Sequence, residues 1–173
     1  MLLLNKRLGI QKEFGMNRYI SGIVGILVLA GCKTAPTEQY QHVQLIEAEL
    51  VSTKWESLER FSPQYPIETA REGKEGCASI EYVITPDYEI RDIKVIASNS
   101  KYFAKQAKLS IKQWKWSELS KGIIQEPIKT STQFQFCLET GDGHCAEKSY
   151  FENSKCSGED IIYSIGYRVR RPG

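Results

Sequence analysis

The fold is decided by residues 76–97, which read GCASIEYVITPDYEIRDIKVIA. From Ala78 to Ile84 every second residue is apolar, while Cys77, Ser79 and Glu81 point the other way. Side chains of a strand alternate between two faces, so this half predicts a β-strand with one buried face. Residues 85–88 (TPDY) place Pro at the second position of a turn. Residues 90–97 alternate again, imperfectly between 90 and 93, and the whole stretch predicts a β-hairpin.

A helix is predicted after the hairpin, from about Lys101 to Trp114. Its N-cap candidates are the three residues Ser98-Asn99-Ser100. The helix has an apolar stripe at spacings of four, four and three, formed by Phe103, Ala107, Ile111 and Trp114. The opposite side is basic and carries Lys101, Lys105, Lys108, Lys112 and Lys115. A solvated helix face explains these lysines, and the alternative is a surface that meets anionic lipid or peptidoglycan.

A third strand is predicted over Lys129 to Leu138, where Phe134, Phe136 and Leu138 alternate with Gln133, Gln135 and Cys137. Because a helix joins the second strand to the third, these two should be parallel, and the slot between them suits the first strand, antiparallel to both. The pattern predicts an α+β fold, a three-stranded mixed sheet of β-β-α-β topology and strand order 2-1-3 packed on one helix. Residues 161–168 (IIYSIGYR) are a candidate for an extra C-terminal strand.

The segments around this unit have weaker patterns. Residues 33–41 are polar and predict a tether, and Val43 to Arg60 fits either a helical stripe or an extended chain. Each residue before a proline in Ser62-Pro63-Gln64-Tyr65-Pro66 is restricted to extended conformations. A short helix is expected from Ile67 to Arg71, ended by Gly73. Residues 139–159 are rich in Gly, Asp, Asn and Ser and predict a loop.

The N-terminal segment predicts export. Residues 20–30 form an apolar run of 11, which is too short to span a membrane and follows Arg18. The run ends in Leu29-Ala30-Gly31-Cys32, which resembles the lipobox of bacterial lipoproteins, so residues 1–31 are expected to be a signal peptide, with Met1 or Met16 as the start. Cys32 would then be lipidated. Lys33 follows it, which in the resembling lipoproteins favours the outer membrane, so we expect a periplasmic domain anchored there.

Composition and charge exclude several classes. The 173 residues are 41% hydrophobic and 25% charged, which is typical of a globular protein and not of a disordered, collagenous or polytopic membrane protein. Four of the 23 basic residues and one of the 21 acidic residues precede Cys32, so the net charge from Cys32 onward is −1. A near-neutral body argues against nucleic acid as a partner. No G-x-S-x-G, P-loop or H-E-x-x-H motif is present, and we predict no enzyme, cofactor or metal.

Cys77, Cys137, Cys145 and Cys156 are an even number in an oxidising compartment and predict two disulfides. In the 2-1-3 order Cys77 opens the first strand beside the end of the third, and the alternation puts Cys77 and Cys137 on the same face. The predicted pairs are therefore Cys77 with Cys137 and Cys145 with Cys156. A zinc site from these cysteines and His144, or a Cys/His nucleophile pair at 144–145, are the alternatives.

Many weak elements in a fixed order make residues 63–138 resemble the C-terminal domain of TonB. TonB is the periplasmic protein that couples the inner membrane to outer-membrane transporters. The resemblance comprises Pro63-x-Tyr65-Pro66, Ala70, Gly73-x-x-Gly76, the hairpin, and Val95 followed by Ser98. It continues with Ile111-x-x-Trp114-Lys115-Trp116, Gly122, Pro127 and Phe134-x-Phe136.

The resemblance implies that the third strand or its neighbour offers an edge to an extended partner segment by β-augmentation. The edge would carry Thr130, Thr132, Gln133 and Gln135. The partner would be an envelope protein, for example a TonB-dependent outer-membrane receptor, and a homodimer is left open.

The chain departs from TonB in its N-terminal part. TonB has an uncleaved membrane helix and a long proline-rich stretch, whereas this chain has a lipobox and only about 30 residues before the domain. We therefore expect residues 32–61 to be a lipid-anchored tether and extension, 62–139 a TonB-like domain, and 140–173 a disulfide-pinned extension. The expected function is a non-enzymatic envelope lipoprotein that binds another protein. Energy transduction is the alternative if the leader stays uncleaved.

Overall fold

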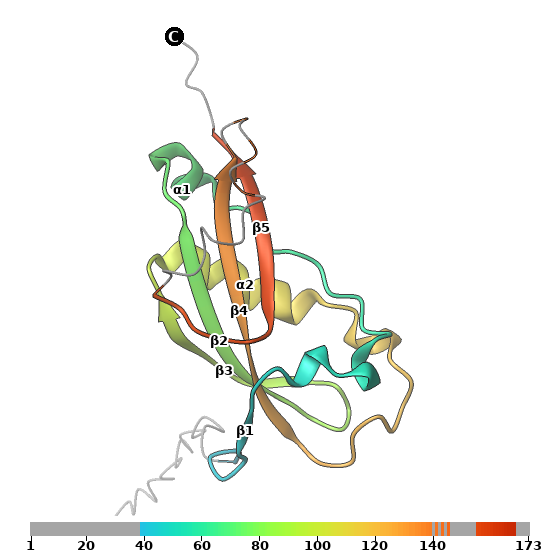
Figure 1. The fold of residues 1–173 in the computed structure, drawn as a ribbon. Helices are drawn as coiled ribbons and strands as arrows, with labels where there is room; N and C mark the ends of the chain where they lie inside the picture. The colour runs from blue at the N-terminus through green and yellow to red at the C-terminus, as the bar shows by residue number, and fades with distance from the viewer. Residues whose placement is uncertain (1–38, 140, 142, 144, 146–154, 169–173) are drawn as a thin grey trace, which may run out of the picture. The chain divides into compact units, whose positions relative to one another are not determined.

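The computed structural model describes residues 39–139, 141, 143, 145 and 155–168, and these residues build one mixed β-sheet with a long helix on one face (Figure 1). The sheet consists of β1 (Leu45–Ile46), β2 (Gly76–Ile84), β3 (Ile90–Ser98), β4 (Ile128–Glu139) and β5 (Ile161–Tyr167). The strand order is β1-β4-β2-β3, and β5 also pairs with β4. The predicted hairpin and the 2-1-3 order of the three central strands are confirmed, since β2 lies between β3 and β4 and is antiparallel to both.

The sheet has two strands besides the three central ones, and one of them, β5, confirms the candidate C-terminal strand at 161–168. Both additional strands, β1 and β5, run parallel to β4 on the same edge. β1 pairs at Lys129 and Thr130, and β5 pairs along Gln133–Glu139. β1 has only two residues, which is too short to produce an alternating pattern in the sequence.

The imperfect alternation in the hairpin corresponds to a bulge. The β2–β3 register shifts between Glu81 and Val83, and Asp92 on the opposite strand has a positive φ of 46°. A bulge inserts an extra residue into one strand and increases the local twist. β3 therefore bends where its apolar pattern breaks.

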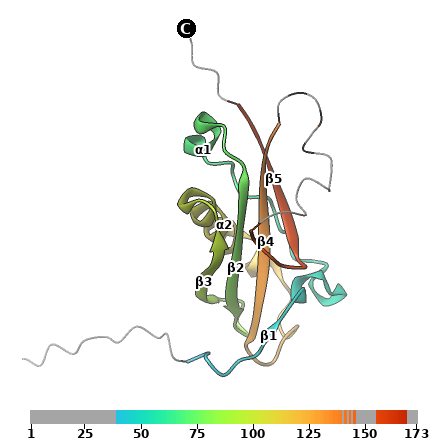
Figure 2. The ribbon, with the colours of Figure 1, turned by 60° about the vertical axis from the view of Figure 1, so that its left-hand side comes forward.

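The main helix is α2 (Lys101–Gln113), and it covers one face of the sheet (Figure 2). The Ser100 hydroxyl accepts a hydrogen bond from the Tyr102 N–H at 3.2 Å, which confirms an N-cap within the predicted group. Phe103 and Ile111 of its apolar stripe are buried against Phe134 and Phe136 of β4 in one hydrophobic core. Phe103 stacks on Phe136 with ring centroids 4.4 Å apart.

The segment before the domain is packed into it. Between Val43 and Arg60 the chain forms β1 and two 3-10 turns, η1 (Glu49–Val51) and η2 (Thr53–Trp55), which resolves the ambiguity of the sequence. Leu50, Trp55 and Leu58 of this stretch are buried in the main core. The predicted short helix is α1 (Ile67–Glu72), and Gly73 ends it with φ 65°. The 3-10 turn η3 (Trp116–Glu118) follows α2.

The other face of the sheet is crossed by the segment that leads into β5, drawn in front of β2 and β4 in Figure 1. The Ser79 hydroxyl of β2 donates a hydrogen bond to the Ser157 carbonyl at 2.7 Å. A disulfide joins Cys77 to Cys156 with 6.0 Å between the Cα atoms. The C-terminal extension is thus fastened across the face that α2 leaves open.

The predicted disulfide pairing is wrong, although all four cysteines form disulfides. The observed pairs are Cys77–Cys156 and Cys137–Cys145. Cys77 lies opposite Gln135, so Cys137 is displaced by two residues along the strand. Such diagonal neighbours are about 7–8 Å apart, beyond the usual Cα separation in a disulfide. The strand order and the shared face of Cys77 and Cys137 were predicted correctly. The two-residue offset between them along the strands excludes a disulfide.

Candidate functional site: the edge of the sheet

The edge predicted to bind a partner, the outer side of β4, is occupied within the chain. Thr130 and Thr132 are fully buried, and Gln133 and Gln135 are nearly so. β1 covers the start of β4 and β5 covers its second half. The expectation of a free edge here is therefore corrected: two segments from outside the predicted domain complete the sheet on this side.

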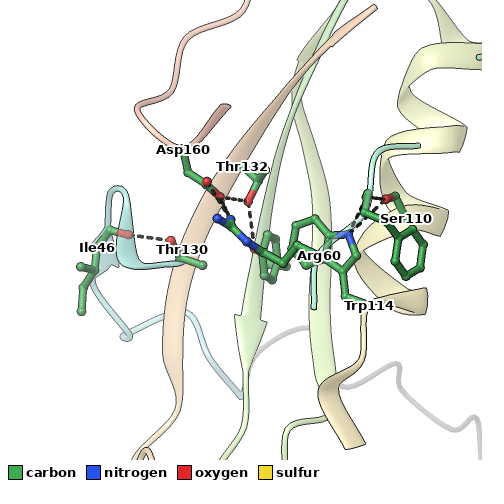
Figure 3. A network of polar contacts seen from close by, with 9 residues as sticks. Ile46, Arg60, Ser110, Trp114, Thr130, Thr132 and Asp160 are labelled. Carbon is green, nitrogen blue, oxygen red and sulfur yellow. Dashed lines mark hydrogen bonds and ion pairs between the residues drawn. The ribbon is translucent and has the colours of Figure 1, made fainter. Parts of the chain in front are cut away.

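A buried polar network fastens the start of β5 (Figure 3). Arg60 donates from one guanidinium nitrogen to both carboxylate oxygens of Asp160, at 2.8 and 2.9 Å. The Thr132 hydroxyl of β4 donates to the same carboxylate at 2.7 Å. The Asp160 side chain is 3% exposed and that of Arg60 23%, so this ion pair is screened little by solvent. The network joins residues 100 positions apart in sequence.

The network extends into the core through Tyr82 of β2. Its hydroxyl lies 2.9 Å from the Thr132 hydroxyl, and its side chain is fully buried. Burial raises the pKa of Tyr82 far above its ordinary value, because a phenolate would lose its hydration there. Tyr82 is therefore held as a neutral hydrogen-bonding group.

Arg60 also contacts Trp114, one of the two tryptophans of the predicted motif. Its guanidinium carbon lies 5.7 Å from the Trp114 ring centroid, a cation–π distance. The Trp114 indole N–H bonds the Phe61 carbonyl at 3.0 Å, and the Trp116 indole N–H bonds the Ile111 carbonyl at 2.6 Å. Both rings are buried, so these motif tryptophans hold the end of α2 against the preceding chain.

The other motif residues position the extended segment before α1. The Tyr65 hydroxyl donates to the Lys74 carbonyl at 2.5 Å, and Pro66 is the residue that precedes α1. A Cβ on Gly166 of β5 would lie 2.4 Å from the Tyr65 ring, so only glycine allows this approach. Gly76, the remaining motif residue, is the first residue of β2, and a Cβ there would lie 2.1 Å from the Asn99 side chain.

The outer side of β5 is the exposed edge of this half of the sheet. Within the described part of the chain, β5 pairs as a strand with β4 alone. Its sequence, IIYSIGY, contains no charged residue and no proline, and Ile161, Ile165 and Tyr167 are 39%, 53% and 73% exposed. The opposite edge, β3, carries Arg91, Asp92 and Lys94 and a bulge. Charges and bulges protect an edge strand from pairing, and β5 has neither.

The sulfur atoms proposed for alternative chemistry are in disulfides. Glu75, Cys137 and Cys145 bring one ligand atom each within 4.8 Å of one another, but the two sulfurs are bonded to each other. Cys145 is therefore not available as a thiolate nucleophile in this state. His144, the other half of both alternatives, lies outside the described residues, as does Cys32.

Residues 62–138 match the family model of the Gram-negative bacterial TonB protein C-terminal. Residues 62–138 are therefore similar to a TonB C-terminal domain, and we call them the TonB domain of this chain. The solution NMR structure of the Pseudomonas aeruginosa TonB C-terminal domain is 26% identical, covers 45% of this chain and 80% of that one, and gives a TM-score of 0.38. No curated protein matches the chain.

TonB C-terminal domains are periplasmic, typically non-enzymatic, and bind envelope proteins. The match ends at residue 138, so β5 lies outside the TonB domain, and so do β1, Arg60 and Asp160. Among the helices of the described residues, none is long and apolar enough to cross a membrane.

Sequence reasoning found the possible strand at 161–168 and missed what fastens it. Asp160 lies in a polar, turn-like segment, where an acidic residue is ordinarily solvated. A usable signal was the abrupt change at Asp160 from polar residues to the uncharged run IIYSIGY.

Proposed function

We propose that this chain is a non-enzymatic cell-envelope lipoprotein, anchored through Cys32, that binds an extended segment of another envelope protein at the edge of its sheet. The observation that carries the proposal is the outer edge of β5, which is uncharged and exposes Ile161, Ile165 and Tyr167. An edge strand of this kind is a template for β-augmentation, where backbone hydrogen bonds provide affinity and alternate side chains provide specificity.

The choice of β5 follows from the occupancy of the other edges. A partner strand could reach β4 only by displacing β5, which Cys77–Cys156 and the Arg60–Asp160 ion pair oppose. A partner on β3 would meet a bulge and three charged residues. β5 therefore takes over the binding role that the resemblance assigned to β4. An outer-membrane receptor with an extended periplasmic segment is one partner of this class.

The edge is tested by comparing Ile165→Lys with Ile96→Lys. Both residues are exposed, by 53% and 60%, and they lie on opposite edges of the sheet. Proteins that cross-link to the wild-type chain in envelope preparations should be lost with Ile165→Lys and kept with Ile96→Lys. Equal cross-linking by the two variants contradicts binding at β5.

The anchor is tested separately by mass spectrometry of the membrane fraction. We expect a chain that begins at Cys32 and carries a lipid adduct. Recovery of residues 16–31 on the mature protein contradicts the anchor and favours energy transduction through an uncleaved membrane segment.

A further inference from the structure

The surface that points to a second ligand is a line of four lysines on α2, Lys101, Lys105, Lys108 and Lys112, which we call the lysine stripe. Lys101, Lys105 and Lys112 are exposed and Lys108 is half-buried. None of the four forms an ion pair among the described residues, whereas Lys54, Lys74, Arg91 and Lys115 each pair with a glutamate. We propose that the lysine stripe faces the membrane and binds anionic phospholipid head groups.

The stripe is costly for the helix by itself. Its spacings of four, three and four place neighbouring lysines in contact range, and like charges at these spacings destabilise a helix. Lys101 also lies in the first turn, where the helix dipole disfavours a cation. α2 contains no acidic residue that could relieve this repulsion. A solvated helix face ordinarily mixes both signs, so the single sign indicates an anionic partner.

The position of the tether selects the bilayer as that partner, and this step rests on the proposed anchor at Cys32. Gln39 and Tyr40, the first described residues, line the same hollow as Lys112. Only six residues separate Cys32 from Gln39, and a fully extended chain of that length reaches roughly 25 Å. The anchor would therefore hold the Lys112 end of the stripe close to the head groups.

Neighbouring groups agree with this orientation. Leu109 is 39% exposed and lies one helical turn from both Lys105 and Lys112, so it can contact the interface while the lysines reach the phosphates. Asp87, Glu89 and Asp92 line the hollow around Lys112 together with Arg91, which pairs with Glu89. The acidic residues are in excess there, so the positive potential is strongest over the other three lysines. The hollow includes residues of β3, the edge opposite β5, and the orientation therefore leaves β5 accessible to a protein partner.

The test is lysine footprinting of the protein isolated from membranes and reconstituted into vesicles. In equimolar phosphatidylglycerol and phosphatidylcholine, acylation of the four stripe lysines should slow at least fivefold relative to phosphatidylcholine alone, with about fivefold weaker binding for each lysine removed. Lys121, exposed and outside α2, should react equally in both. Lys105→Gln combined with Lys108→Gln should remove the protection of Lys101 and Lys112, and Lys121→Gln should preserve it.

Other outcomes overturn the proposal. Equal acylation in both vesicles does so directly. The same protection by inorganic phosphate over phosphatidylcholine assigns the stripe to free phosphate, and protection only in whole envelopes assigns it to an acidic protein. Vesicle flotation of protein without a lipid on Cys32 distinguishes binding by the anchor from binding by the lysine stripe. This protein should fail to float with phosphatidylcholine vesicles, because the anchor is missing. Salt-sensitive flotation with phosphatidylglycerol vesicles would report binding by the lysine stripe alone.

Discussion

Asp160, which follows the TonB domain in the chain, connects the segments on either side of that domain. Its carboxylate accepts hydrogen bonds from Arg60, which precedes the domain, and from Thr132, which lies within it. Removal of one partner from a buried ion pair leaves an uncompensated charge, which is more damaging than loss of the pair. We expect Arg60→Ala to lower the free energy of unfolding by about 3 kcal/mol in urea denaturation with the disulfides intact. Arg60→Ala with Asp160→Asn should recover part of the loss.

The exposed pair Arg91–Glu89 provides the matched control. Arg91→Ala should change the free energy of unfolding by less than about 1 kcal/mol, because surface ion pairs contribute little. A similar loss for Arg60→Ala and Arg91→Ala would mean that the Asp160 carboxylate is reached by water.

Tyr82 gives the fold a dependence on alkaline pH. Its pKa is raised in the folded state by burial, so the folded protein keeps a proton that the unfolded chain releases above about pH 10. The free energy of unfolding should therefore be unaffected by this group below pH 10 and fall as the pH rises above it. Urea denaturation between about pH 9 and 11 should show a smaller decline for Tyr82→Phe than for the wild type. Parallel declines would assign the alkaline sensitivity to other groups.

Among the elements, β5 packs closely against Tyr65 because Gly166 has no side chain. Gly166 faces the Tyr65 ring so closely that a methyl group must displace the ring or the strand. We expect Gly166→Ala to cost about 1–3 kcal/mol in free energy of unfolding, as overpacking of a core does. Ile165→Ala is the comparison, since Ile165 is exposed on the opposite face. Equal losses of unfolding free energy in the two variants would mean that alanine weakens β5 through its low strand propensity and not through a clash with Tyr65.

The elements predicted from sequence are those long enough to show a repeating pattern of buried apolar residues on one face. Apolar residues recur with a period of two in β2 and of about 3.6 in α2. The irregular positions 90–93 of β3 correspond to its bulge. β1 and the 3-10 turns have no period, because two or three residues do not complete one. Leu50 and Trp55 are core residues without a pattern around them, and only the tertiary structure identifies them.

At the scale of the whole molecule, the two disulfides should differ in their contribution to stability. Cys77–Cys156 spans a sequence separation of 79 and Cys137–Cys145 one of 8. In the loop-entropy model the long link contributes up to about 4.5 kcal/mol and the short one up to about 2.5 kcal/mol. Replacing Cys77 and Cys156 by serine should therefore lower the unfolding midpoint more than replacing Cys137 and Cys145.

Peptide mapping without reduction supplies the direct check of connectivity. A peptide with Cys77 should be joined to one with Cys156. A link from Cys77 to Cys137 would contradict the register in which Cys77 lies opposite Gln135.

The topology of the central sheet was predictable because chain connectivity and handedness leave few arrangements. The offset between neighbouring strands was not, since a shift of two residues preserves every apolar pattern. That shift decides the disulfides, and the pairing of β5 with β4 decides which edge is exposed. Arg60 and Asp160, 100 residues apart, likewise give no local signal. The resemblance therefore predicts the kind of candidate site, an edge of the sheet, but only the structure shows that the exposed edge belongs to β5.

The nested disulfides have a consequence for biogenesis. A chain exported from its N-terminus presents Cys77 to the oxidising compartment first among the four cysteines, and its partner Cys156 last. Cys137 and Cys145 appear in between and pair with each other inside the larger loop. Oxidation in order of appearance would join Cys77 to Cys137, a non-native bond that thiol–disulfide exchange must then reverse. Maturation of this protein should therefore require a disulfide isomerase, and not an oxidase alone.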